Sequence, residues 1–177
     1  MFDRYDPFAR VLHWLIAVLV IGMLGLGFYA VTLDYYDPLY HRSVAWHRSC
    51  GLVVAVLMGV RIVWRLTHPP APLPDSLPAW ERWAAHANHL ALYVVLIVLP
   101  VSGYLLSTAD GRGVSLFGWF DFPALLPAAK GREDWSGKLH LAMAVVLCLL
   151  LTLHVAAAIK HLIAITRSHP PREDFIQ

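Results

Sequence analysis

The stretch that decides the fold is HLAMAVVLCLLLTLH, from His140 to His154. It is apolar apart from Thr152 and the two histidines at its ends. At 100° per residue, 14 residues of α-helix make four turns less roughly 40°, so both rings project from the same face of the helix. At a rise of 1.5 Å per residue, the two histidines lie roughly 21 Å apart along the helix axis. Because ionisable rings are costly in such a segment, the pair predicts axial ligands for two stacked haems. Two histidines hydrogen-bonded to neighbouring helices are the alternative.

The composition is that of a membrane protein. Of the 177 residues, 58% are hydrophobic and only 15% are charged, which is too apolar for a soluble domain. Four apolar runs are long enough to cross a bilayer. The sequence therefore predicts an all-α membrane protein, a four-transmembrane-helix bundle enclosing two haems, as one domain over residues 1–177 with the lipid bilayer as its partner. The spans are expected at about residues 8–31, 41–66, 81–108 and 133–166.

Several other classes are excluded. The net charge of +2 gives no electrostatic case for binding nucleic acid. Cys50 and Cys148 both lie in apolar segments, and the absence of C-x-x-C-H argues against covalent c-type haem attachment. No glycine-rich phosphate loop is present. The first apolar run contains His13 and is too long for the core of a signal peptide, so no cleavable signal is expected.

Topology assigns a depth to each buried histidine. Four spans place both termini on one side, and lysine and arginine are more numerous on that side, eight against six, which favours cytoplasmic termini. His13 is then near the inner end of the first span and His47 near the outer end of the second. His140 is outer and His154 inner. We therefore predict two bis-histidine haem-iron sites, an inner one of His13 with His154 and an outer one of His47 with His140.

Other ligand sets fit this pattern less well. Neutral imidazole is an ordinary ligand of haem iron. Zinc would require four ligands at one site, with more carboxylate or thiolate. Met143 and Cys148 are alternative ligands, but they break the pairing by depth. A haem-free structural or transport bundle has no need of paired histidines.

Arg61 and the connection at residues 109–134 carry two further expectations. Arg61 follows His47 by 14 residues and shares its helix face, so a haem propionate is a candidate partner for the guanidinium. Snorkelling to the surface is the alternative. Residues 109–134 are aromatic and interrupted by glycine and proline, and are expected to form an interfacial segment that caps the bundle.

Three histidines remain near the inner surface. His86 and His89 stand three residues apart near the start of the third span, and we assign them to a quinone site or to a haem propionate. His161 follows His154 by seven residues on the same face, and its side chain suits proton supply to a quinone. Interfacial solvation is the alternative for all three.

The histidine motifs together resemble the bacterial cytochrome b-561 family over nearly the whole chain. They are His13-Trp14, H-x-x-C-G at residues 47–51, H-x-x-H at residues 86–89, and H-x13-H from His140 followed by His161. This small di-haem family includes superoxide oxidase and is related to the cytochrome b subunits of hydrogenases and formate dehydrogenases.

The resemblance implies two haem b groups held by the same two histidine pairs. It also implies superoxide oxidation at the periplasmic side, ubiquinone as electron acceptor and a location in the bacterial inner membrane. The alternative is a relay or anchor subunit that passes electrons between a dehydrogenase or hydrogenase partner and the quinone pool.

Overall fold

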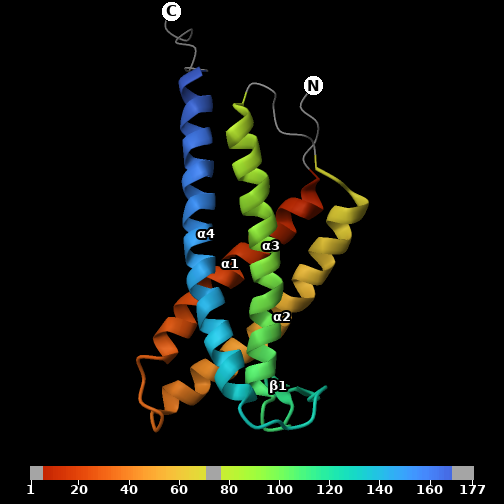
Figure 1. Cartoon of the computed structure of the whole chain (residues 1–177), viewed down its shortest axis with the longest axis vertical. Coiled ribbons are helices and arrows are strands. Elements are labelled where there is room, and N and C mark those ends of the chain that lie inside the picture. The colour runs from red at the N-terminus through yellow and green to blue at the C-terminus, as the bar shows by residue number, and fades with distance from the viewer. Residues whose placement is uncertain (1–5, 71–76, 169–177) are drawn as a thin grey trace, which may run out of the picture.

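The computed structural model describes residues 6–70 and 77–168 and is dominated by four long helices (Figure 1). They are α1 (Pro7–Ala30), α2 (Pro38–Thr67), α3 (Ala79–Ser107) and α4 (Arg132–Ser168). Each is long and apolar enough to cross a membrane. The predicted all-α membrane bundle with four spans is thus confirmed.

Capping residues determine where the first two helices begin. The carboxylate of Asp6 accepts a hydrogen bond from the backbone N–H of Phe8 (2.9 Å), and that of Asp37 accepts one from Leu39 (2.8 Å). Proline follows each aspartate, at a position where its missing N–H and fixed φ suit a first helical turn. Because of this signal, α2 begins at Pro38 rather than near the expected residue 41.

The helices form two hairpins that cross one another (Figure 1). Helix α1 packs on α2, α3 packs on α4, and α2 also contacts α3. The start of α1 and the end of α4 lie at one end of the bundle, which we call the terminal side. The opposite end carries the α1–α2 turn and two short strands, and we call it the hairpin side (Figure 1).

The interior of the bundle is small and its exterior is apolar. The core cluster draws side chains from all four helices, and Leu147 lies in it, midway along α4 between His140 and His154. No more than 17% of the apolar window of any span is buried within the chain. Large apolar side chains therefore face outward, as a surface solvated by lipid requires.

The connection between α3 and α4 folds as a small antiparallel β-hairpin of β1 (Val114–Leu116) and β2 (Phe120–Phe122). Ser49 on α2 holds it, because its hydroxyl oxygen accepts from the N–H of Phe117 (3.0 Å) and lies 3.1 Å from the carbonyl of Ser115. On α3, the Tyr104 hydroxyl donates to the Pro123 carbonyl (2.7 Å). The segment expected to cap the bundle is thus fixed to the hairpin-side ends of α2 and α3.

Candidate functional site

Four histidines meet in two pairs near opposite ends of the bundle. The ring centroids of His47 and His140 lie 6.0 Å apart at the hairpin side. Those of His13 and His154 lie 6.2 Å apart towards the terminal side. The rings of each pair are nearly perpendicular, at 79° and 73°. The residues paired by the depth argument are therefore neighbours in space.

Hydrogen bonding orients one ring of the hairpin-side pair, that of His140. Nδ1 of His140 lies 3.0 Å from the Leu99 carbonyl and 3.2 Å from the Ser102 hydroxyl. Since a carbonyl only accepts, this contact requires a proton on Nδ1 and leaves Nε2 with its lone pair free. Metal-bound histidines show this arrangement, in which the second ring nitrogen donates to a carbonyl. Nδ1 of His47 is buried and has no hydrogen-bond partner among the described residues.

Glycines make room for the hairpin-side rings. A Cβ atom on Gly27 would lie 3.0 Å from Cε1 of His47, and one on Gly103 would lie 3.0 Å from Cε1 of His140. These contacts are tighter than ordinary van der Waals distance, so even an alanine would require each ring to move by a few tenths of an ångström. Each ring is seated against the bare backbone of a neighbouring helix.

The ring separations fit a shared iron ion. A metal–imidazole bond is about 2 Å long, so two rings bound on opposite sides of one ion have centroids roughly 6 Å apart. Both observed separations agree with this value. The donor set, two neutral imidazoles per site, suits haem iron. The residues present therefore fit a b-type haem at each pair.

The terminal-side pair has different neighbours. The ring of His89 lies 5.3 Å from that of His154, so a third imidazole stands beside this pair. Arg61 of α2 donates from Nη1 to the Ala9 carbonyl (3.2 Å) and lies over the Tyr93 ring at 5.9 Å. Arg61 is a half-buried residue, and its guanidinium is held against the first turn of α1 and the Tyr93 ring of α3.

The two hairpins repeat the same spacings. In α1, His13 precedes Gly27 by 14 residues, and in α3, His89 precedes Gly103 by 14. In α2, Arg61 follows His47 by 14 residues, as His154 follows His140 in α4. At the hairpin side the two helical hairpins correspond: α1–α2 contributes Gly27 and His47, and α3–α4 contributes Gly103 and His140. At the terminal side they differ, because α2 has Arg61 at the position that His154 occupies in α4.

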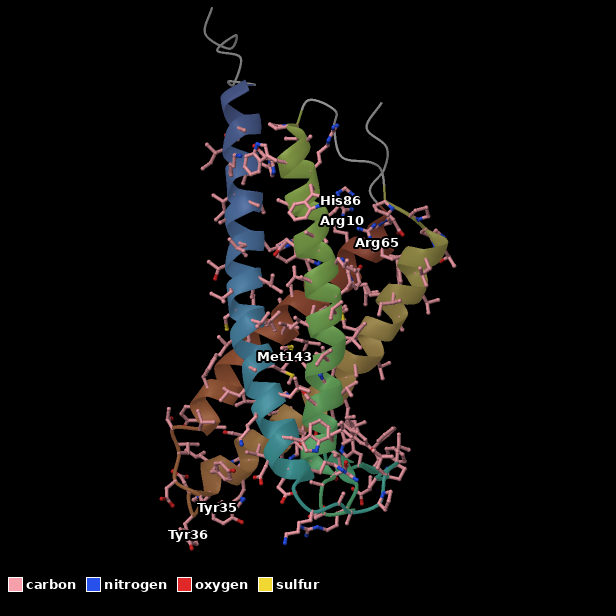
Figure 2. The ribbon with its side chains drawn as sticks, in the orientation of Figure 1. Arg10, Tyr35, Tyr36, Arg65, His86 and Met143 are labelled. Atoms are coloured by element: carbon pink, nitrogen blue, oxygen red, sulfur yellow. The ribbon has the colours of Figure 1, made fainter. Side chains whose placement is uncertain are left out.

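The remaining candidate residues lie apart from the ring pairs. His86 is exposed near the terminal side, with Nδ1 2.7 Å from the Arg82 carbonyl (Figure 2). His161 is half-buried in α4, next to Lys160, which pairs with Glu81 of α3 at 2.8 Å. The alternative ligand Met143 packs against the central core instead.

A cavity of about 720 Å³ opens at the hairpin side, on the same side of the membrane domain as His47. Arg48, Arg112 and Lys130 contribute cations to its lining, whereas Asp110 and Glu133 contribute carboxylates. The backbone N–H of Arg112, and then its side chain, donate to Asp110 and hold the pKa of that carboxyl below its ordinary value. Arg112 and Asp110 therefore neutralise each other, and the lining retains a positive balance.

Sequence reasoning did not identify Gly103, Ser102 or the Leu99 carbonyl as neighbours of His140. The 14-residue spacing from His89 to Gly103, equal to that from His13 to Gly27, was the available signal. A carbonyl acceptor has no sequence signature, because every residue carries one.

Comparison with known proteins agrees with this geometry. The family model for prokaryotic cytochrome b561 matches residues 4–167. Cytochrome b561 homolog 2 of Escherichia coli (strain K12) is 44% identical over 160 residues, which cover 90% of this chain and 85% of the relative.

Two more distant relatives also match along most of their length. A protein of Yersinia pestis named probable superoxide oxidase CybB is 27% identical over 169 residues, 91% of this chain and 90% of its own. Cytochrome b561 homolog 1 of Escherichia coli (strain K12) is 24% identical over 163 residues, 90% of each chain.

Proposed function

This chain belongs to the prokaryotic cytochrome b561 family, and from that premise we propose that it oxidises superoxide at the hairpin side and passes the electrons to ubiquinone. Membership makes it a multi-pass bacterial membrane protein of electron transfer, with b-type haem. We place it in the inner membrane with cytoplasmic termini, so that the hairpin side faces the periplasm. The observation that carries the proposal is the occurrence of two histidine pairs at two depths, with a cationic cavity at the hairpin end.

We assign two haem b groups to the two pairs. His13 and His154 would hold the terminal-side iron, and His47 and His140 the hairpin-side iron. When bound, the haems supply the one-electron chemistry, and the protein sets their position and potential. The Leu99 carbonyl fixes the tautomer and orientation of His140, while Gly27 and Gly103 leave the rings free to approach the metal. Arg61 is the candidate donor to a terminal-side propionate.

Superoxide enters the proposal through charge and through one relative. Superoxide is a small anion, and loss of one electron converts it to neutral oxygen without breaking a bond. Arg48 and Lys130 give the cavity lining positive charge, which attracts an anion. Arg48 also directly follows the proposed ligand His47 in the sequence. The name of the Yersinia pestis relative supports the same substrate.

Ubiquinone is assigned to the terminal side, where protons are required. Two electrons and two protons convert the quinone to quinol. His89 is the histidine beside His154, where it would contact a quinone or a propionate near that ring. His161 and His86 lie nearer the end of the bundle, where they could return protons from water. We propose His161 as the proton supplier and His86 and His89 as quinone or propionate contacts.

Stopped-flow mixing of oxidised, haem-loaded protein with superoxide tests the proposal. We expect fast haem reduction, followed by reoxidation when a soluble ubiquinone analogue is present. Superoxide dismutase added before mixing should abolish the reduction. Haems that stay oxidised would reject the enzyme and favour the relay subunit, which should then be recovered in a complex with a soluble redox protein.

One substitution tests the quinone step separately. His161→Ala should leave reduction by superoxide unchanged and slow the reoxidation by quinone. His68→Ala is a matched control, because His68 also lies at the terminal side but stacks on Trp64 at a centroid distance of 4.0 Å. Equal behaviour of the two variants would reject the role of His161.

A further inference from the structure

The two histidine pairs differ in the charges around them. Both sites offer the same donor set, two imidazoles, so axial ligation gives no reason for their reduction potentials to differ. A difference must then come from hydrogen bonds, burial or nearby charge. The structure separates the sites most clearly by charge.

Arg61 places a cation at the level of the terminal-side pair. It follows His47 by 14 residues, just as His154 follows His140, so the two side chains occupy equivalent depths on α2 and α4. Hydrogen bonding to the Ala9 carbonyl, one turn before His13, holds the guanidinium there. The guanidinium also lies over the Tyr93 ring, 5.9 Å from its centroid, so its charge stays between the helices at this end. Arg65 follows Arg61 by about one helical turn on α2.

The hairpin-side pair lacks this field. The ring of His140 contacts the Leu99 carbonyl and the Ser102 hydroxyl, and the ring of His47 lies against Gly27 and the ring of His140. Within residues 6–70 and 77–168, no hydrogen bond, ion pair or cation–π contact brings a lysine or arginine to either ring. Arg48 lies on the exposed surface and lines the cavity instead.

We propose that Arg61 makes the terminal-side site the more oxidising of the two and so directs electrons from the hairpin side to the terminal side. A fixed positive charge favours the reduced iron, which carries one positive charge less than the oxidised iron. One electron leaves the hairpin-side centre and one arrives at the terminal-side centre, and no bond changes. Arg61 would thus raise the reduction potential of the terminal-side iron through its charge, without being a ligand of that iron. The inference rests on the two-haem part of the proposed function and is independent of the donor.

Potentiometric titration of the purified holoprotein tests this role. In the unsubstituted protein, the haem component that is lost in His13→Ala should have the higher midpoint potential. Arg61→Gln should lower that potential by about 59 mV or more, which is a tenfold change in electron distribution for a one-electron couple. The hairpin-side component should move much less. Arg61→Lys should retain most of the unsubstituted value.

Two further variants keep the test decisive. Arg65→Gln should lower the terminal-side potential by a smaller amount, because Arg65 lies about one helical turn beyond Arg61 on α2. Arg10→Gln removes an exposed charge from the same end of the bundle and should change both potentials less than Arg61→Gln changes the terminal-side one (Figure 2). If Arg61→Gln fails to fold, the Arg65→Gln shift decides.

Unchanged potentials, or equal shifts of both components, would overturn the inference. So would a terminal-side component with the lower potential in the unsubstituted protein. A single haem per chain would overturn both this inference and the proposed function. Slow reaction with superoxide, together with the expected shifts, would reject the substrate and retain the role of Arg61.

Discussion

Gly103 lies directly against the ring of His140, so that a Cβ atom at this position would be only 3.0 Å from Cε1. The same helix supplies the Leu99 carbonyl to Nδ1, and helix α3 thereby fixes both the position and the tautomer of the ring. Gly103→Val should displace His140 at a cost of about 1–3 kcal/mol, as overpacking generally does. We expect loss or high-spin conversion of the hairpin-side haem alone, measured by haem content and electron paramagnetic resonance.

Gly22→Val is the matched control, because no atom lies within 4 Å of a Cβ at that position. It should leave both haems in place. If Gly103→Val retained an unchanged hairpin-side haem, the close approach of Gly103 to the His140 ring would not be needed for ligation.

The four paired histidines predict two non-covalent, low-spin haems per chain. Pyridine haemochrome analysis against protein concentration should give a ratio of two, and acid acetone should extract all of the haem. The physical reason is that each pair offers two strong-field nitrogen ligands to one iron. A ratio of one, or haem that remains with the protein on extraction, would contradict the assignment.

Substitution of a single histidine ligand should remove one of the two haem components from the absorption spectrum. His13→Ala and His154→Ala should each remove the same component, and His47→Ala and His140→Ala the other, because each pair shares one depth. Low-temperature absorption of the α-band distinguishes the components. A common loss in His13→Ala and His140→Ala would show that the pairs are wrongly assigned.

The regular helical spacing explains why so much of this arrangement could be predicted. A rotation of 100° per residue is a local property, so the interval from His140 to His154 and the order of the spans were enough to match the depths. The seat of His140 depends on contact between α3 and α4, which no local rule supplies. The start of α2 was placed too late because Asp37 and Pro38 were taken as part of the turn rather than as a cap.

The path of the connection from α3 to α4 decides which hairpin-side cations act together. Arg48 and Lys130 line the cavity, whereas Lys138 does not, although it also lies near a proposed ligand in the sequence. Arg48→Glu should slow haem reduction by superoxide several-fold at low salt, since steering by surface charge changes association rates by tenfold or more. Stopped-flow rates measured at increasing salt provide the test.

Lys138→Glu is the control, with the same charge reversal outside the cavity. Its effect should be smaller, and both effects should fade as the Debye length falls from about 30 Å at 0.01 M to about 3 Å at 1 M salt. Reduction by a small neutral reductant should be unaffected. Equal slowing by the two substitutions would assign the attraction to the whole face rather than to the cavity.

The contact between Asp6 and Trp64 predicts acid-sensitive anchoring of α1. The Trp64 indole N–H donates to the carboxylate, the Phe8 ring packs on Trp64 at 4.4 Å, and the first of these contacts is the main reason that the pKa of Asp6 lies below its ordinary value of 3.8. A lowered pKa means that the folded protein favours the carboxylate. Its contribution to stability is therefore complete above about pH 3.8 and is lost as the pH falls through the lower value of the folded state.

Asp6→Asn keeps an N-cap side chain but removes the charged acceptor for Trp64. We expect a lower unfolding temperature than that of the unsubstituted protein at pH 6, and a difference that narrows progressively below pH 3.8 as the native carboxylate becomes protonated. Asp37→Asn changes the equivalent cap of α2, which accepts from Leu39, and should give a smaller difference at pH 6. Thermal unfolding in detergent, followed by circular dichroism across this pH range, measures both. A difference for Asp6→Asn that stayed constant down to pH 2 would show that the charge of Asp6 does not anchor the helix.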